Sequence, residues 1–263
     1  MLVFDNGTLS FYSGENNDCY KRIDSIEHMF YTYYIIFYCI GHGKEYNMNK
    51  EWSELNKTIQ QQIKRKETFS QGIDTLLALR KSLMQQMLAF RDTLPTDAFS
   101  AMPYLNANGY HNKTIAYSLW HIFRIEDIVV HTLIRKDEQV FFAGEYQKKM
   151  HAPIITTGNE LVKEEIADFS KELDIAALYD YIMAVDSSTK TVLSEMTWPD
   201  LKTKMTDGDK EKIRKLHVVS EDEKATWLID YWCGKNIQGL IQMPLSRHWI
   251  MHVEAALRIA NKI

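Results

Sequence analysis

Cysteine, proline and net charge are all scarce in this sequence, and each shortage narrows the class of protein. The 263 residues include three cysteines and five prolines, and the formal net charge is −4. Cys19, Cys39 and Cys233 form no CxxC pair, which fits free thiols in a reducing cytosol better than a disulfide framework. The weak negative charge gives no electrostatic reason to expect nucleic acid. We therefore expect a cytoplasmic protein with no nucleic-acid partner.

Long apolar runs are also missing. The longest candidate is the aromatic run MFYTYYIIFYCI at residues 29–40, and a membrane-spanning helix needs ~20 apolar residues. Its acidic flank and the lack of a small-residue cleavage site argue against a signal peptide. We expect no membrane partner, although a weakly inserted tail is an alternative for this run.

The first 47 residues differ in composition from the rest. They hold two of the three cysteines and the aromatic run, and we find no helical or strand period in them. From Met48 the sequence MNKEWSEL opens a helix. We therefore divide the chain into residues 1–47, an extension or a misassigned translation start, and one domain at residues 48–263.

The domain from residue 48 onward is predicted to be all-α, because apolar residues recur at helical spacing and no segment alternates as a strand. The predicted helices are residues 50–92, interrupted near Gly72; 113–135, capped by Asn112; 160–170, after Asn159; 175–196, after Asp174; a short helix after Asp207; 223–242; and 246–262, beyond Pro244. Several long helices joined by moderate loops indicate a bundle of the four-helix type with additional short helices.

Two histidines near the C-terminus lie on one helix face. His248 and His252 are four residues apart, so their rings leave the same face about one turn, ~6 Å, apart. The stripe continues through Ala255, Ala256 and Ile259, which turns the rings toward the bundle interior. Buried polar rings need partners, and one shared metal ion would satisfy both.

His121 is the best candidate for a third ligand, because Ile125 and Ile128 continue its face as an apolar stripe. His131 is ten residues further along and rotated by roughly 80°, so it cannot share a metal with His121, and we interpret it as structural. The other histidines lie in loops, in a charged connection or in the first 47 residues: His28, His42, His111, His151 and His217.

Four stretches resemble the DinB/YfiT-like superfamily of metalloenzymes: YSLWHIFRIEDIVVHTLI, TTGNELVKEEIADFS, WLIDYWCGKNIQGLIQMP and SRHWIMHVEAALRI. The most specific parts are the histidine after Trp120 and the terminal RHxxxH. The resemblance implies a DinB-like four-helix bundle, often a homodimer, in which three histidines hold zinc, nickel or a similar divalent ion. On this chain those metal ligands are His121, His248 and His252.

Three protein ligands leave one coordination position open, as in catalytic zinc sites. By resemblance we favour metal-assisted transfer of a low-molecular-weight thiol to an electrophile. The alternatives are a metal-dependent hydrolase and a non-enzymatic, stress-associated binding protein. No general base can be assigned.

Carboxylates often orient metal-bound histidines from behind. The candidates for this role are Glu126, Asp127, Asp230 and Glu254. Arg124 could pair with Asp127 or Glu126, and Arg247 could meet an anionic substrate, although structural roles are favoured for both arginines.

Overall fold

The computed structural model describes residues 2–5, 8–13, 18–23, 45–107 and 112–263, with side chains described from residue 49 onward. Contacts divide the chain into two units, Met1–Glu51 and Trp52–Ile263. Whether the first 47 residues belong to the natural protein stays a prediction. The aromatic run at residues 29–40, His28, His42 and His111 lie outside the described residues.

The first unit contains a small sheet that we did not predict. Its strands are β1 (Leu2–Asp5), β2 (Thr8–Ser13) and β3 (Asp18–Ile23). They pair antiparallel in the order β1-β2-β3, with a register shift at Phe11/Tyr12. The longest of the three strands has only six residues, too few for a period of two to stand out from the surrounding sequence.

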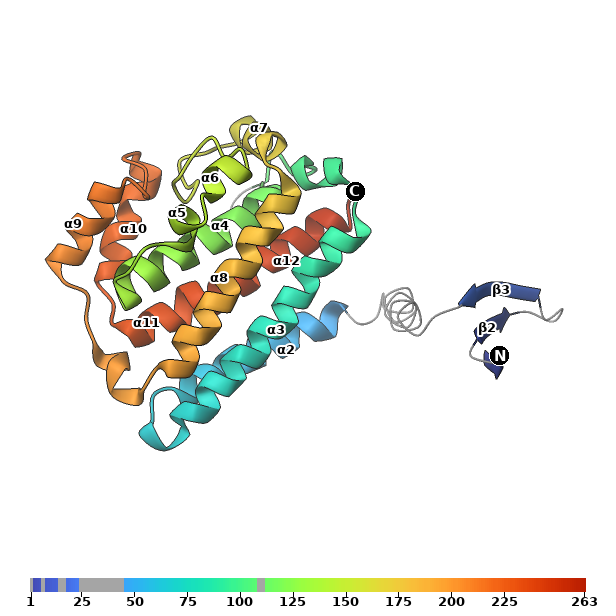
Figure 1. The fold of residues 1–263 in the computed structure, drawn as a ribbon, viewed down its shortest axis with the longest axis horizontal. Coiled ribbons are helices and arrows are strands. Elements are labelled where there is room, and N and C mark those ends of the chain that lie inside the picture. The colour runs from blue at the N-terminus through green and yellow to red at the C-terminus, as the bar shows by residue number, and fades with distance from the viewer. Residues whose placement is uncertain (1, 6–7, 14–17, 24–44, 108–111) are drawn as a thin grey trace. The chain divides into compact units, whose positions relative to one another are not determined.

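The rest of the chain is helical, which confirms the all-α prediction for this unit (Figure 1). The α-helices are α2 (Glu45–Gln62), α3 (Phe69–Thr93), α4 (Ile115–Asp127), α5 (Val140–Ala143), α6 (Tyr146–Lys149), α7 (Glu164–Glu172), α8 (Ile175–Glu195), α9 (Asp207–Leu216), α10 (Glu223–Cys233), α11 (Ile237–Gln242) and α12 (His248–Ala260). Short 3-10 helices are η2 (Lys66–Thr68), η3 (Thr96–Ser100) and η6 (Trp198–Lys202), and π-helical segments are η5 (Ile128–Arg135) and η7 (Met243–Arg247). Among the described residues from 49 onward, the only β pairing is an isolated bridge, Lys204–Asn236.

The first predicted helix is interrupted, but not near Gly72. The break lies between the end of α2 and the start of α3, and Gly72 is inside α3. A Cβ atom on Gly72 would lie 2.6 Å from Cγ2 of Ile63. The glycine is therefore a point of close approach between consecutive helices and not a helix breaker.

Two of the predicted helix starts were wrong and one is confirmed. Thr114, not Asn112, caps α4, because its hydroxyl accepts from the Tyr117 amide at 3.0 Å. Asn159 lies in a loop, and α7 begins at Glu164. Asp174 does cap α8, accepting from the Ala177 amide at 2.9 Å, as expected for an aspartate at this position.

The predicted helix 223–242 is two helices, α10 and α11, separated at residues 234–236. Pro244 does not separate α11 from α12 by a loop. It lies in η7, whose π-helical turns run directly into His248, the first residue of α12. The chain therefore enters α12 without a break in helical backbone.

Helix α4 lies at the centre of the second unit, since all thirteen of its residues are buried. It packs against α8 and α12, and α3 packs against the same two helices. Figure 1 shows α3 and α8 running side by side. A helix buried on every face needs polar partners for its polar side chains, and α4 finds them in the two networks described next.

One buried arginine joins all four of these helices. Arg80 of α3 donates to both oxygens of Glu126 of α4 at 2.8 and 2.7 Å, and to Asp186 of α8 at 3.0 Å. The indole of Trp249 on α12 donates to Glu126 at 2.8 Å. Burial alone would lower the pKa of Arg80, but the two carboxylates raise it above its ordinary value.

A second buried arginine fixes the far end of α4. Arg124 pairs with Asp127 at 3.2 Å and donates to the carbonyl of Ile155 at 2.8 Å. Asp127 also accepts from the amides of Val140 and Phe141, at 2.9 Å each. The loop after η5 is thereby held against α4.

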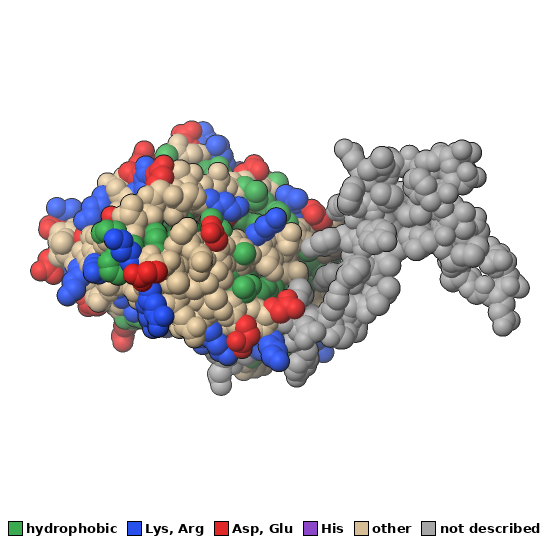
Figure 2. All heavy atoms as spheres, turned by 90° about the horizontal axis from the view of Figure 1, so that it is seen from below, with side chains coloured by type: hydrophobic (Ala, Val, Ile, Leu, Met, Phe, Trp, Pro, Cys, Tyr) green, Lys and Arg blue, Asp and Glu red, His purple; other side chains and the backbone are tan. Residues whose placement is uncertain are grey.

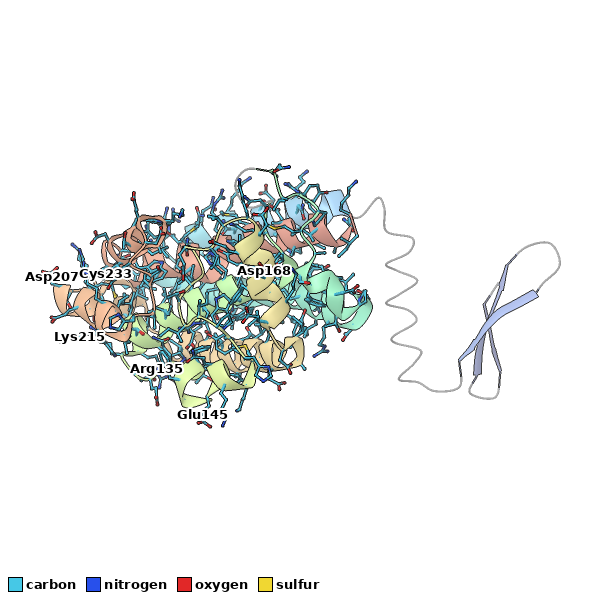
Figure 3. All side chains as sticks on the ribbon, turned by 90° about the horizontal axis from the view of Figure 1, so that it is seen from above. Arg135, Glu145, Asp168, Asp207, Lys215 and Cys233 are labelled. Atoms are coloured by element: carbon cyan, nitrogen blue, oxygen red, sulfur yellow. The ribbon has the colours of Figure 1, made fainter. Side chains whose placement is uncertain are left out.

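Over the coloured residues of the face in Figure 2, positive and negative side chains are interspersed and neither sign gathers in one large area. Within the described part of the chain, no helix is long and apolar enough to cross a membrane. Cys233 is a free, buried thiol at the end of α10, on the side of the molecule that carries Asp207 (Figure 3).

Candidate metal centre

Three buried histidines from two helices converge at one point. His121 comes from α4, and His248 and His252 come from α12. One nitrogen from each ring can be chosen so that all three atoms lie within 4.8 Å of one another. The ring centroids of His121 lie 5.0 Å from His248 and 4.7 Å from His252. The group is therefore placed to hold a metal ion.

His121 is oriented from behind by a backbone carbonyl. Its Nδ1 lies 2.7 Å from the oxygen of Thr157, so Nδ1 carries the proton and donates it, and Nε2 is left with its lone pair. Such a bond fixes the tautomer and the ring orientation of a metal-binding histidine. The ring of Tyr117, one turn earlier on α4, stacks on His121 at 5.5 Å with an interplanar angle of 11°.

The loop that supplies this carbonyl has an unusual backbone. Gly158 has φ +79°, and a Cβ atom there would lie 3.0 Å from the Tyr117 ring. The hydroxyl of Tyr117 donates to the Gly158 carbonyl at 3.0 Å. Glycine is required because this φ is unfavourable for residues with a side chain and because Tyr117 occupies the space.

All three imidazoles are in the form that binds metal. Burial is the main cause that lowers the pKa of His121 to about 4. The hydrogen bond to Thr157 raises this pKa and the charge of Lys113 lowers it, both by less than burial does. Burial also holds the pKa values of His248 and His252 well below the usual range. Neutral rings offer a lone pair at neutral pH, as coordination requires.

The residues fit a divalent ion. Nδ1 of His248 is buried and has no hydrogen-bond partner in the described structure, and an orphaned ring nitrogen beside two other imidazoles is what a bound ion would satisfy. Among the described residues, the cluster contains no fourth histidine, cysteine or carboxylate. Imidazole is a ligand for several divalent transition metals, so the group is suited to an ion of that class.

Both ligand-bearing helices adjoin π-helical segments. The π-helical η5 follows α4 after Asp127, and η7 immediately precedes His248. In η7 the hydroxyl of Ser246 donates to the carbonyls of Ile241 and Gln242 at 3.0 Å each. π-helical turns are uncommon and occur often at functional sites.

The carboxylates proposed to lie behind the histidines have other partners. Glu126 is bound by Arg80 and Trp249, and Asp127 by Arg124. Asp230 is exposed and pairs with Lys210. Glu254 is half-buried, and burial raises its pKa by more than the nearby charges of Arg258 and Arg247 lower it. His121 uses a backbone carbonyl in place of a carboxylate, a partner that no side-chain pattern reveals.

His131 has a different environment, in keeping with its interpretation as structural. Its Nδ1 lies 2.7 Å from Asp137 and its Nε2 lies 3.1 Å from Ser188 of α8. This order of groups is the one found in serine hydrolases. However, Asp137 also pairs with Arg135, labelled in Figure 3, and neither hollow described below includes Ser188. The histidine therefore links η5 to α8.

Comparison with models of known protein families gives no match, and no curated protein matches the chain significantly. The family is not shown. The likeness to DinB/YfiT-like proteins rests on the quoted motifs, and the function of the site has to be argued from its own residues.

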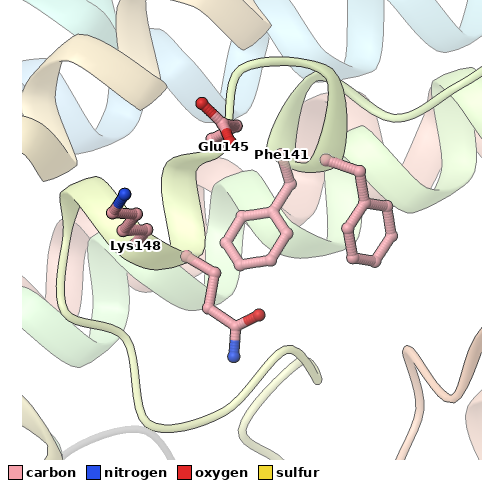
Figure 4. Close-up of a pocket in the computed structure, with 5 residues that line it drawn as sticks. Phe141, Glu145 and Lys148 are labelled. Atoms are coloured by element: carbon pink, nitrogen blue, oxygen red, sulfur yellow. The ribbon is translucent and has the colours of Figure 1, made fainter.

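Two surface hollows lie away from the histidines. The first, of about 360 Å³, is lined by Phe141, Phe142, Glu145, Gln147 and Lys148 (Figure 4). The second, of about 500 Å³, is lined by Asp137, Glu138, Gln139, Phe142, Lys212 and Leu216. Neither includes a histidine of the cluster. His121, His248 and His252 are buried, with 6%, 7% and 3% of each residue's surface exposed.

The tryptophans around the site are mostly core. Trp120, Trp232 and Trp249 are buried, whereas Trp227 is 51% exposed on α10. Trp249 lies beneath the guanidinium of Arg80 at 4.0 Å. It follows His248 in the chain, so the buried network described above fixes the helix that carries two of the three histidines.

Proposed function

We propose that His121, His248 and His252 bind one divalent ion, zinc or nickel, and that the protein is a metal-dependent enzyme that transfers a low-molecular-weight thiol to an electrophile. The observation that supports this is the convergence of three buried, neutral imidazoles with no fourth described protein ligand. A closed structural zinc site would use four protein ligands. The substrate would therefore occupy the coordination position of the ion that no protein side chain fills.

The ion, when bound, would supply Lewis acidity and stabilise a thiolate at neutral pH. The chain's own residues orient and shield it. Thr157 fixes the ring of His121, and Tyr117 covers one face of that ring. Burial raises the pKa of Tyr117, so its hydroxyl keeps its proton and donates it to Gly158. Tyr117 thus supports the site and does not act as its acid.

The family and the assembly belong to the same proposal. The packing of α3, α4, α8 and α12 around Arg80 supports a DinB-like four-helix bundle. By the same resemblance we propose a cytoplasmic homodimer with a small-molecule substrate. Size-exclusion chromatography with light scattering would measure the mass directly, and a monomeric mass would contradict the dimer.

Metal content tests the site first. The full chain, expressed with zinc and nickel supplied, should contain close to one ion per chain by elemental mass spectrometry, and His248→Ala/His252→Ala should contain almost none. The matched control is His151→Asn/His217→Asn, which changes two exposed histidines and should leave the content unchanged. A parent protein without metal would overturn the site.

Turnover then separates the functions. The metal-loaded protein should accelerate the reaction of cysteine with 1-chloro-2,4-dinitrobenzene. In this reaction the thiol loses its proton to solvent, a C–S bond forms, and the C–Cl bond breaks to release chloride. Turnover of an ester or amide without any added thiol would instead favour the hydrolase. An apo protein that folds and binds its partner as well as the loaded one would favour the binding protein.

A further inference from the structure

Lys113 is a cation beside the histidine cluster that forms no ion pair with the described part of the chain. Its side chain is half-buried, and none of the ion pairs in the described structure includes it. Burial lowers its pKa from the ordinary value. A lysine that is partly withdrawn from water and unpaired by the protein is available to an anion from outside.

The contact with Tyr117 places Lys113 beside the site. Lys113 lies just before Thr114, the N-cap of α4, whereas Tyr117 and His121 lie one turn apart within the helix. The ammonium lies 5.1 Å from the Tyr117 ring, and that ring stacks on His121. Lys113 is thus one aromatic ring away from a ligand of the proposed metal.

Its field reaches both helices of the site. The charge of Lys113 contributes to the low pKa of His121 on α4 and of His252 on α12. Lys113 was not singled out by sequence, because it lies before α4 and outside the helical period.

The charges around the cluster do not balance. The three rings are neutral, so a divalent ion would bring two positive charges and Lys113 a third. Glu126 and Asp127 are paired with arginines. Glu160 is the carboxylate that acts on Tyr117. Its side chain accepts from the Thr156 hydroxyl and forms no ion pair with Lys113, and its Oε2 is buried without a hydrogen-bond partner in the described structure. Glu160 offsets one of the three positive charges, so a bound divalent ion would still leave the site positive.

Taking the proposed function as given, we propose that Lys113 binds a second anionic group, a carboxylate, on the thiol substrate whose sulfur occupies the open metal position. The substrate class is then an anionic thiol and not a neutral one. Lys113 would act as a specificity residue, since it would bind the substrate away from the reacting sulfur.

The test compares two thiols of nearly equal size on the cobalt-loaded full chain: 3-mercaptopropionate and its amide. Binding is followed by the thiolate-to-cobalt absorption band. The parent should bind the carboxylate at least tenfold more tightly than the amide. Lys113→Met should weaken binding of the carboxylate about tenfold, or ~1.4 kcal/mol, and leave binding of the amide unchanged. Lys113→Arg should keep most of the preference.

Lys171→Met is the matched control, because Lys171 is exposed and pairs with Asp168 on α7. Its thiol preference should equal that of the parent, and cobalt content should be equal in all four proteins. An unchanged preference in Lys113→Met overturns the role of Lys113 and leaves the thiol-binding metal site standing. A parent that binds cobalt but gives no thiolate band with either thiol overturns the proposed function as well.

Discussion

Replacing Arg80 by methionine tests how the four central helices are held together. The change removes the cation that faces Glu126 and Asp186, whose side chains are 0% and 2% exposed. Lys190 still pairs with Asp186, and Trp249 still donates to Glu126. Glu126, which is fully buried, then has no cation to compensate its negative charge. Its carboxyl group must either take up a proton or remain as an uncompensated buried charge.

The size of the loss follows from the cost of that proton. A glutamate in an unfolded chain titrates near pH ~4.3 and each pH unit corresponds to ~1.4 kcal/mol, so holding it protonated at pH 7 costs ~3–4 kcal/mol. This agrees with the ~3–5 kcal/mol expected for breaking a buried ion pair. At pH 5 the same proton costs only ~1 kcal/mol, so most of the deficit should disappear on acidification.

Urea unfolding followed by circular dichroism at pH 7 and pH 5 measures both values. Arg80→Met/Glu126→Gln/Asp186→Asn removes all three charges and should recover part of the stability. Lys57→Met breaks an exposed pair with Glu54 and should leave the stability unchanged within error. A loss below ~1 kcal/mol at pH 7, or one that does not shrink at pH 5, would refute the reasoning.

Three further results are expected. The apo protein should lose stability as the pH falls from about 6.5 to 4, because His121 binds a proton in this range in the unfolded chain but not in the native protein, where its pKa is about 4. Urea unfolding at several pH values measures this slope. If His248→Ala/His252→Ala left the slope unchanged, the depressed pKa values of these histidines would be wrong. For the same reason zinc binding at pH 6 should release almost no protons, whereas three histidines with ordinary pKa values would release about two. Calorimetry in two buffers of different ionisation enthalpy measures the number of protons released. Gly158→Ala should lower the free energy of unfolding in urea by ~1–2 kcal/mol, since alanine is strained at a positive φ. It should also weaken zinc binding, because it displaces the Thr157 carbonyl that orients His121. An unchanged zinc affinity would show that this loop does not influence the site.

The convergence of the histidines could be predicted because it depends on periodicity. Four-residue spacing places His248 and His252 on one face, and the apolar neighbours of His121 mark its face as buried. The bond that orients His121 could not be predicted, because it comes from a loop carbonyl whose position depends on the backbone of Gly158. Side-chain patterns carry no information about such an acceptor.

Some helix limits could likewise be predicted from the sequence and others could not. Asp174 has the side chain that an N-cap needs, and the helix begins there. The break between α2 and α3 lies in a stretch without glycine or proline, IKRKET at residues 63–68, so composition gives no sign of it. Gly72 misled the prediction because its role is set by contact with Ile63 and not by helix propensity.

The partners of the carboxylates were likewise a question of three-dimensional packing. Glu126 and Asp127 follow His121 closely in sequence, which suggested that they serve it. On a helix, residues five and six positions apart point to different faces, and each carboxylate meets an arginine there. Arg124 was predicted to pair with Asp127 or Glu126, and it pairs with Asp127. The pairing of Glu126 with Arg80 was not predicted, since Arg80 lies 46 positions before Glu126.

The π-helical turns before His248 bear on which changes in chain length the protein can tolerate. Each residue of an α-helix turns the chain by about 100°, and a π-helical turn accommodates one residue more than an α-helical turn. The wide turn of η7 thus absorbs one extra residue without turning α12. Deleting a single residue from η7 should therefore give an ordinary helical turn and leave His248 and His252 facing His121, whereas deleting a second would turn α12 by about 100° and carry both histidines away. The site should thus survive the loss of one residue between Gln242 and His248 but not the loss of two, and relatives of this chain that keep the three histidines should differ there by at most that one residue.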